Sequence, residues 1–329
     1  MKVAIHANVI DGRGLGKTPF DYGLGLKNIY GHEVCFLTSK LSKNDGAPRV
    51  EKHFPVYYYE GNIDLTPKNV IKSQIEKIVN DEKIEFMHLL KAGENDNITP
   101  DNCKTGIHCV FNMCEQHGNV YAAVSQNLAN KYNSDLYVPH IIKRIPVTKD
   151  LRKELNIPKD ALVIGRHGGI STFDLAFVKE TVKEIVNKRK DVYFLFLSTE
   201  VFYSHERVIY FPWVSQEAGI FNFINACDIM LHARQMGETF GLSVAEFAIS
   251  NKPVMTWSGM WQGSKQTVYD TAHIDHLKGK AIIYNDGVDL LDTVMNLDTN
   301  YLRNNNWDTI SSEFNETKVM EQYNKVFLQ

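Results

Sequence analysis

The sequence has few cysteines, no long apolar run and no excess of one charge, and each absence excludes a class of protein. The five cysteines are an odd number and none forms a Cys-x-x-Cys pair, which is typical of a reducing compartment rather than of a disulfide framework. No apolar run approaches the roughly 18 residues that a membrane-spanning helix needs. The 36 basic and 39 acidic residues give a net charge of −3, without the positive excess that holds nucleic acids.

The start of the sequence also shows no sign of a secreted protein. Residues 1–9 lack a charged region followed by an apolar stretch and a small-residue cleavage site, so we expect no signal peptide. We therefore expect a cytoplasmic protein with no integral membrane segment and no nucleic-acid partner.

The length of 329 residues predicts two domains, since domains usually run to about 100–200 residues.

Short β-rich runs alternate with amphipathic segments, which predicts an α/β fold with parallel sheets and right-handed crossovers. The expected helices cover residues 70–79, 174–186, 215–226, 242–250 and 313–328. The expected strands cover residues 2–10, 33–38, 84–90, 105–111, 123–125, 162–165, 192–197, 228–233 and 253–257.

A predicted linker divides this pattern into two doubly wound domains, because Pro139 and Pro146 interrupt the periodicity. We expect an N-terminal domain at residues 1–142, a second domain at 143–312, and a last helix within 313–329 whose apolar face can pack on the first domain. In such sheets ligands bind at the carboxyl ends of the strands, so two facing domains would hold a ligand in a cleft.

A glycine-rich turn, D-G-R-G-L-G-K-T, follows the first expected strand at residues 11–18. A phosphate-loop NTPase would have a glycine at Asp11, and the dinucleotide fingerprint would have one at Lys17, so both motifs are incomplete. The turn is either a flexible connection or a loop in which Gly14 and Gly16 let backbone N–H groups approach a phosphate or a sugar. The phosphate-loop NTPase is kept as an alternative function.

A second motif combines two glutamates with a helix start. Residues 237–254 are G-E-T-F-G-L-S-V-A-E-F-A-I-S-N-K-P-V, which places Glu238 after a strand and Glu246 in the next helix. Both carboxylates can then face the strand ends, where a carboxylate suits the vicinal hydroxyls of a sugar or a ribose. Gly241 and Leu242 would present helix-start N–H groups to a phosphate. The alternative is that both glutamates are solvated or cap the helix.

This block resembles the donor-site motif of the GT-B glycosyltransferases, in particular the retaining family 4. Residues 40–65 match nothing in that family, but the similarity spans most of the chain. The other matching segments are the glycine-rich turn and residues 31–34, 123–125, 151–158, 165–166 and 226–228.

The resemblance implies two Rossmann-like domains facing a cleft, and an enzyme that moves a sugar from a nucleotide-sugar donor with retention of configuration. The donor would be a UDP- or GDP-sugar, the acceptor a glycan, a lipid or a small molecule, and no cofactor is expected. Glycosyltransferases that use a metal generally carry an Asp-x-Asp motif; the chain has none, so we expect catalysis without a metal. A non-catalytic sugar-nucleotide-binding protein is the alternative, and a sugar-nucleotide epimerase shares the fold.

The resemblance also implies roles for single residues. Glu246 would hold the ribose hydroxyls, Glu238 would contact the transferring sugar, and Arg166 would neutralise the diphosphate, with Phe240 also in the donor site. A surface position is the alternative for Arg166.

The family has a lysine several residues after that arginine, but this chain has Ile-Ser-Thr at 170–172. Thr172 or Ser171 could donate an uncharged hydrogen bond in its place, and Lys17 or Lys265 could supply the missing cation.

The family's catalytic-side histidine follows a strand of the first domain, and His108 is the best match, with His117 as its rival. The alternative for either is a neutral imidazole making one hydrogen bond. Neighbouring cysteines lack the paired spacing of structural zinc sites, so we expect no metal. His232 and Arg234 end a strand, where they would either contact the donor or pack.

Overall fold

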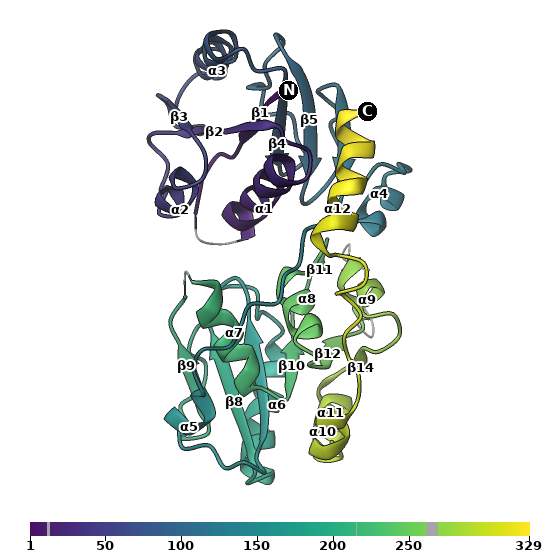
Figure 1. Cartoon of the computed structure of the whole chain (residues 1–329). Helices are drawn as coiled ribbons and strands as arrows, with labels where there is room; N and C mark the ends of the chain where they lie inside the picture. The colour runs from purple at the N-terminus through teal and green to yellow at the C-terminus, as the bar shows by residue number, and fades with distance from the viewer. Residues whose placement is uncertain (12–13, 215, 261–268) are drawn as a thin grey trace. The chain divides into compact units, whose positions relative to one another are not determined.

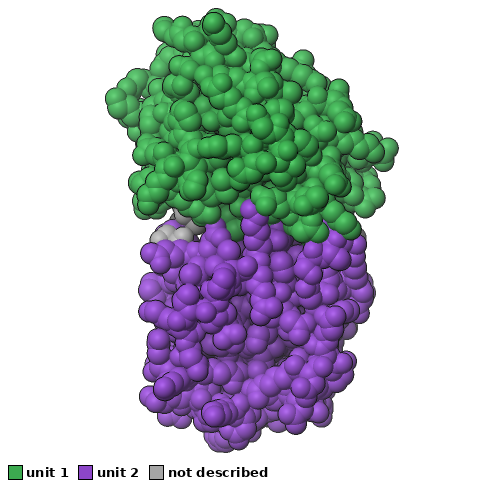
Figure 2. Space-filling model, viewed as in Figure 1, with its two compact units in different colours: residues 1–141, 314–329 green, residues 142–313 purple. Residues whose placement is uncertain are grey.

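The computed structural model describes residues 1–11, 14–214, 216–260 and 269–329, which form two compact units. Unit 1 comprises residues 1–141 and 314–329, and unit 2 comprises residues 142–313 (Figure 2). Ser215, expected to open a helix, and Lys265, considered as a phosphate-binding cation, lie outside the described residues. None of the helices in the described ranges is long and apolar enough to cross a membrane.

Unit 1 is built on a six-stranded sheet in the order β3-β2-β1-β4-β5-β6, in which all neighbouring strands are parallel (Figure 1). This order is that of a doubly wound sheet, so the predicted topology is confirmed. The strands are β1 Lys2–His6, β2 Glu33–Ser39, β3 Val56–Tyr59, β4 Phe86–Lys91, β5 Lys104–Cys109 and β6 Val120–Ala123. The helices are α1 Gly14–Asn28, α2 Ala47–Glu51, α3 Lys68–Glu82 and α4 Gln126–Lys131.

The end of the chain completes unit 1. Helix α12 (Glu316–Tyr323) continues as a π-helical turn, η1 (Asn324–Leu328), and packs on α1 (Figure 1). The Tyr30 hydroxyl donates to the Met320 carbonyl at 2.9 Å, and Tyr323 and Phe327 are fully buried. The last helix therefore contributes core side chains to the first unit.

Unit 2 repeats the architecture with a parallel sheet in the order β14-β12-β10-β7-β8-β9 and a separate two-stranded sheet, β11-β13 (Figure 1). Its strands are β7 Leu162–His167, β8 Val192–Leu197, β9 Val208–Phe211, β10 Ile229–His232, β11 Gly237–Glu238, β12 Val254–Trp257, β13 Asp270–Thr271 and β14 Ile282–Tyr284. Its helices are α5 Leu151–Glu154, α6 Ala176–Lys188, α7 Glu217–Ala226, α8 Leu242–Ile249, α9 Ala272–His276, α10 Gly287–Met295 and α11 Thr299–Asn304.

The strands absent from the prediction lie at sheet edges or in the small sheet. β3, β9 and β14 are edge strands with only one fully buried residue each, so they lack the continuous apolar run of a central strand. Ser125, predicted in a strand, instead caps α4, because its hydroxyl accepts from the Leu128 N–H at 3.1 Å.

Two of the segments that resemble the glycosyltransferase family meet in one buried ion-pair network. Asp228 accepts from Arg152 Nη2 at 2.5 Å, from the Val163 N–H at 2.8 Å, and from Arg303 Nε at 2.8 Å. The network joins α5, the start of β7 and α11 at the amino ends of the strands. Residues 151–158 and 226–228 therefore stabilise unit 2 at the edge opposite to the strand carboxyl ends.

Candidate functional site

Polar side chains collect at the carboxyl ends of the central strands of unit 2. Strands β7 and β10 end in His167 and His232, and Thr256 pairs with His232 across β10 and β12. All three residues are buried. Buried polar groups at this edge are the feature expected of a ligand site in a doubly wound sheet.

Arg166, near the end of β7, is bonded to the backbone around it. Its Nη1 donates to the Ser198 carbonyl and to the Thr199 hydroxyl, each at 2.7 Å. Its Nη2 donates to the Gly169 carbonyl at 2.6 Å and to the Thr172 hydroxyl at 2.7 Å. Nη2 therefore holds the loop between β7 and α6, and Nη1 holds the residues that follow β8.

Arg166 keeps its charge in this environment. Burial lowers the pKa of Arg166 to about 10, while the charges of Glu238 and Asp174 act in the opposite direction. The Thr172 hydroxyl, which accepts from Arg166, donates to the Gly169 carbonyl at 3.0 Å. Its only proton is therefore used within the loop, and the expected hydrogen bond from Thr172 to a phosphate is not supported; Ser171 beside it is exposed.

Glu246 lies one turn into α8 and is 6% exposed. Its Oε2 is 3.2 Å from Nε2 of His167, within ion-pair distance. The His167 ring stacks on Phe247 at 5.8 Å. A nearly buried carboxylate is therefore held beside a strand-end imidazole, His167, which was not among the predicted site residues.

Glu238 is in β11, and each oxygen of its carboxylate has its own partner. Arg234 Nη1 donates to Oε2 at 2.6 Å, and His232 Nε2 lies 3.4 Å from Oε1. Burial acts to raise the pKa of Glu238, but the His232 hydrogen bond and the Arg234 charge outweigh it and lower the pKa below its ordinary value. Glu238 is therefore an oriented carboxylate anion at neutral pH.

The small β11-β13 sheet depends on a glycine. Gly237 has φ +68°, and a Cβ there would lie 2.0 Å from the Asp270 carbonyl oxygen. Strand β11 pairs with β13 next to α9, so this close approach brings Glu238 towards His273. Nothing in the sequence pattern indicates β13, because a two-residue strand has no period to detect.

We expect Gly237→Ala to destabilise unit 2 by about 2–3 kcal/mol, since strained backbone and a steric clash each cost of order 1–3 kcal/mol. Gly279→Ala is the matched control, because Gly279 has φ +78° but a Cβ there would have no atom within 4 Å. Urea unfolding measures both. Equal destabilisation of the two variants would contradict the importance of the Gly237–Asp270 contact.

Helix α8 begins between the two glutamates, as the sequence motif predicts. Gly241, at φ +86°, is the N-cap residue, and Leu242 is the first helical residue and half-buried. Phe240 is 2% exposed and its ring lies 4.7 Å from that of His276. Phe240 is therefore a core residue here, and its predicted contact with a donor is not supported.

The turn predicted over residues 11–18 is wrong from Gly14 onward, because α1 begins at Gly14 and includes Gly16 and Lys17. A Cβ on Gly16 would lie 1.8 Å from the Asp11 carbonyl oxygen, so this glycine lets the Asp11 backbone approach the helix closely. Lys17 forms an ion pair with Asp21 at 2.8 Å, and both side chains are at most 10% exposed. Lys17 is thus paired within its own helix.

His108 lies in the core of unit 1. It is 0% exposed, its ring centroid is 5.3 Å from that of His88 and 5.6 Å from that of Phe327, and its Nε2 is 2.8 Å from the Val138 carbonyl oxygen. Burial lowers the pKa of His108 to about 4. His108 is therefore a fully buried, neutral core imidazole, and this burial argues against its predicted catalytic role.

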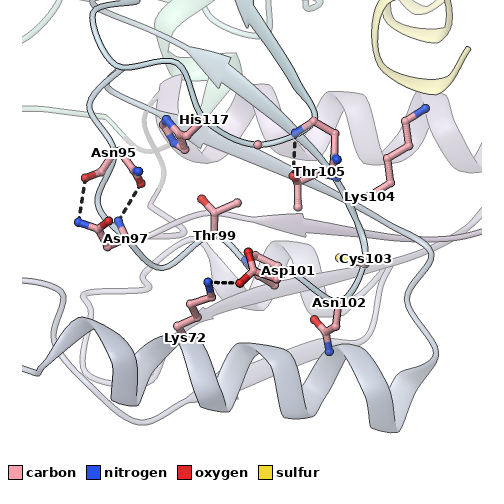
Figure 3. A pocket seen from close by; sticks show the side chains of 13 residues that line it. Lys72, Asn95, Asn97, Thr99, Asp101, Asn102, Cys103, Lys104, Thr105 and His117 are labelled. Atoms are coloured by element: carbon pink, nitrogen blue, oxygen red, sulfur yellow. Dashed lines mark hydrogen bonds and ion pairs between the residues drawn. The ribbon is translucent and has the colours of Figure 1, made fainter.

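His117 lines a polar cavity of about 870 Å³ in unit 1 (Figure 3). Lys104 at the start of β5 and Asn119 before β6 also line the cavity, together with the Lys72–Asp101 ion pair. The cavity therefore lies near strand starts, at the edge away from the carboxyl ends where a doubly wound sheet binds ligands. Within the described residues, no group of three or more His, Cys, Asp or Glu side chains is arranged to hold a metal ion.

No family model and no curated protein matches the sequence. Solved structures do match its fold over nearly the whole chain. Anabaena HepE, solved with UDP and glucose, aligns with a TM-score of 0.71 at 12% identity and covers 99% of this chain and 98% of that one. A glycosyltransferase from Rickettsia africae aligns with a TM-score of 0.68 at 14% identity and covers 99% and 97%.

A putative UDP-N-acetylglucosamine 2-epimerase from Listeria monocytogenes also aligns, with a TM-score of 0.64 at 10% identity, covering 99% of this chain and 96% of that one. The fold is therefore GT-B, with two α/β Rossmann-like units, as the sequence predicted. At such identities the similarity establishes the fold and leaves the reaction to be argued from the site.

Proposed function

We propose that the chain is a glycosyltransferase whose nucleotide-sugar donor binds at the carboxyl ends of the strands of unit 2. The observation that carries this proposal is the placement of Glu246 and Glu238. Both are largely buried carboxylates, follow the central strand β10, and are oriented by basic partners. Buried carboxylates are costly unless they are paired or used, and two beside one sheet edge suit a polyhydroxylated ligand.

In this proposal Glu246 accepts hydrogen bonds from the ribose hydroxyls and Glu238 contacts the transferring sugar. Breaking the anomeric C–O bond transfers its electron pair to the leaving phosphate, so negative charge grows there. The charge of Arg166 and the start of α8 would stabilise this charge. Arg234, whose side chain is 24% exposed, is the candidate for the cation that replaces the family's lysine.

We further propose that transfer retains the anomeric configuration, as the resemblance implies, and needs no metal, because the sequence has no Asp-x-Asp motif. UDP-sugars are the first donors to test, since the Anabaena neighbour was solved with UDP and glucose. The acceptor is a glycan, a lipid or a small molecule.

Thermal unfolding of the full chain with EDTA and UDP-, GDP- or ADP-glucose tests donor binding. A ligand at a hundredfold excess over its Kd stabilises the folded protein by about 2.7 kcal/mol, which a shift in Tm would detect. We expect one base to give this shift without metal. Absence of a shift with all three nucleotide sugars at millimolar concentration would contradict the proposal.

Product analysis separates the proposal from its alternatives. Glycosyl transfer releases a nucleoside diphosphate in an acceptor-dependent manner, whereas an epimerase converts UDP-N-acetylglucosamine without any acceptor. Donor binding with neither product would indicate a non-catalytic binding protein. Magnesium-dependent ATP hydrolysis that is lost in Lys17→Ala would instead indicate a phosphate-loop NTPase.

A further inference from the structure

Three buried side chains form a continuous hydrogen-bonded chain behind Glu238. His232 Nδ1 is 2.8 Å from the Thr256 hydroxyl oxygen, which is 3.2 Å from His273 Nε2. At the other end, His232 Nε2 faces Glu238 Oε1 at 3.4 Å. His232, Thr256 and His273 are each at most 4% exposed, so water does not substitute for these contacts.

The fold fixes each member from a different element. His232 and Thr256 are register partners on β10 and β12, and the Tyr284 hydroxyl donates to the His232 carbonyl at 2.8 Å. His273 is on α9, directly after β13, and its ring centroid is 4.5 Å from that of His232. The chain is thus held by the main sheet on one side and by the small sheet on the other.

The number of available protons determines the direction of the hydrogen bonds. The Thr256 hydroxyl has one proton, which it can give to His232 Nδ1, to His273 Nε2 or to the neighbouring Tyr269 oxygen, so the choice depends on the state of Glu238. Glu238 is an anion and needs a donor, which places a proton on Nε2 of His232. With that proton in place, a hydrogen bond donated by Thr256 to Nδ1 of His232 leaves this nitrogen without a proton, and the Thr256 oxygen then accepts from Nε2–H of His273.

The surroundings of His273 agree with this order. Burial lowers the pKa of His273 well below its ordinary value, the charge of Arg234 acts in the same direction, and the hydrogen bond with the Asp270 backbone acts in the opposite one. Neutral His273 has one ring proton to give. Tyr269, which also lies against Thr256, donates its own hydroxyl proton to the Trp257 carbonyl at 2.7 Å.

We propose that Thr256 is a positioning residue that, together with His273, holds His232 in the Nε2–H tautomer and so orients the Glu238 carboxylate. Arg234 binds the other oxygen of that carboxylate, so two donors on two oxygens fix its plane. Neither Thr256 nor His273 contacts substrate in this scheme. The inference deepens the proposed function, on which its importance for turnover rests.

The tautomers are measured directly by ring ¹⁵N–¹H NMR on the ¹⁵N-histidine-labelled full chain, with His232→Gln and His273→Gln used to assign the two rings among the twelve histidines. We expect both His232 and His273 to be neutral and protonated on Nε2 at pH 7. Finding His232 protonated on Nδ1, or on both nitrogens, would overturn the proposal whatever the protein's activity.

Two substitutions test the consequence. Thr256→Val keeps the shape but removes the hydroxyl, so we expect mixed tautomers at His232 and a fall in kcat of about 10- to 100-fold with little change in KM for the donor. Thr256→Ser keeps the hydroxyl and should retain both the tautomer and kcat within about threefold.

These experiments distinguish a failure of the positioning role from a failure of the proposed function. If the donor binds but Thr256→Val leaves kcat unchanged, the positioning role is wrong while the proposed function stands. If no nucleotide sugar binds the wild-type protein, the proposed function fails, and the wild-type NMR spectrum still decides the tautomer. Should Thr256→Val not fold, Thr256→Ala removes the same hydroxyl and takes its place in the comparison with Thr256→Ser.

Discussion

Glu246→Ala is expected to weaken donor binding by about 10- to 150-fold. The reason is that hydrogen bonds to a charged group contribute about 1.5–3 kcal/mol, and this carboxylate is proposed to accept them from the ribose. Isothermal titration of the wild-type protein and the variant with the UDP-sugar measures the change. Glu246→Gln retains the size but not the charge and should give an intermediate loss.

Two controls separate this effect from damage to the fold. Glu184→Ala, on the exposed face of α6 in the same unit, removes a surface carboxylate paired with Lys188 and should leave the Kd unchanged. His167→Gln removes the imidazole beside Glu246 but leaves the carboxylate, so it should cost less affinity than Glu246→Ala. An unchanged Kd in a folded Glu246→Ala protein would refute the donor-site assignment.

The sequence predicted the central strands well because they are buried on both faces. Val192–Leu197, for example, is a continuous apolar run that follows α6, and β8 has these same bounds. The edge strands were missed because their half-exposed residues resemble loop sequence. Strand β3, with valine followed by three tyrosines, still carries a detectable enrichment in β-branched and aromatic residues.

The candidate site shows the same division between local and distant information. Glu238 and Glu246 lie close together in the sequence, on either side of the start of α8, so the sequence alone could place both after β10. The burial of His108 is not local, because the residues that cover it include Phe327 from the other end of the chain. Thr256 and His273 were missed for the same reason, since they meet His232 only through strand pairing and the β11-β13 sheet.

Asp228→Ala is expected to destabilise unit 2 by about 3–5 kcal/mol, because it leaves the guanidinium groups of Arg152 and Arg303 without their buried carboxylate. All four tryptophans lie between residues 213 and 307, so tryptophan fluorescence during urea unfolding reports on unit 2 alone. Asp191→Ala is the control: its pair with Arg189 is half-exposed, and surface pairs contribute about 0–1 kcal/mol.

The pH dependence of this loss has a definite sign. Burial alone would raise the pKa of Asp228, but the hydrogen bond from Arg303 and the charge of Arg152 outweigh it and hold the pKa below its ordinary value. A carboxyl whose pKa is lower in the folded protein stabilises the fold above its unfolded pKa of about 3.9, and loses that contribution as pH falls through the folded pKa. The stability difference between wild type and Asp228→Ala should therefore be constant from about pH 6 to 8, which is about two to four units above the unfolded pKa. It should shrink below about pH 4. A difference that grew on acidification would mean that Asp228 is not the ionised centre of this network.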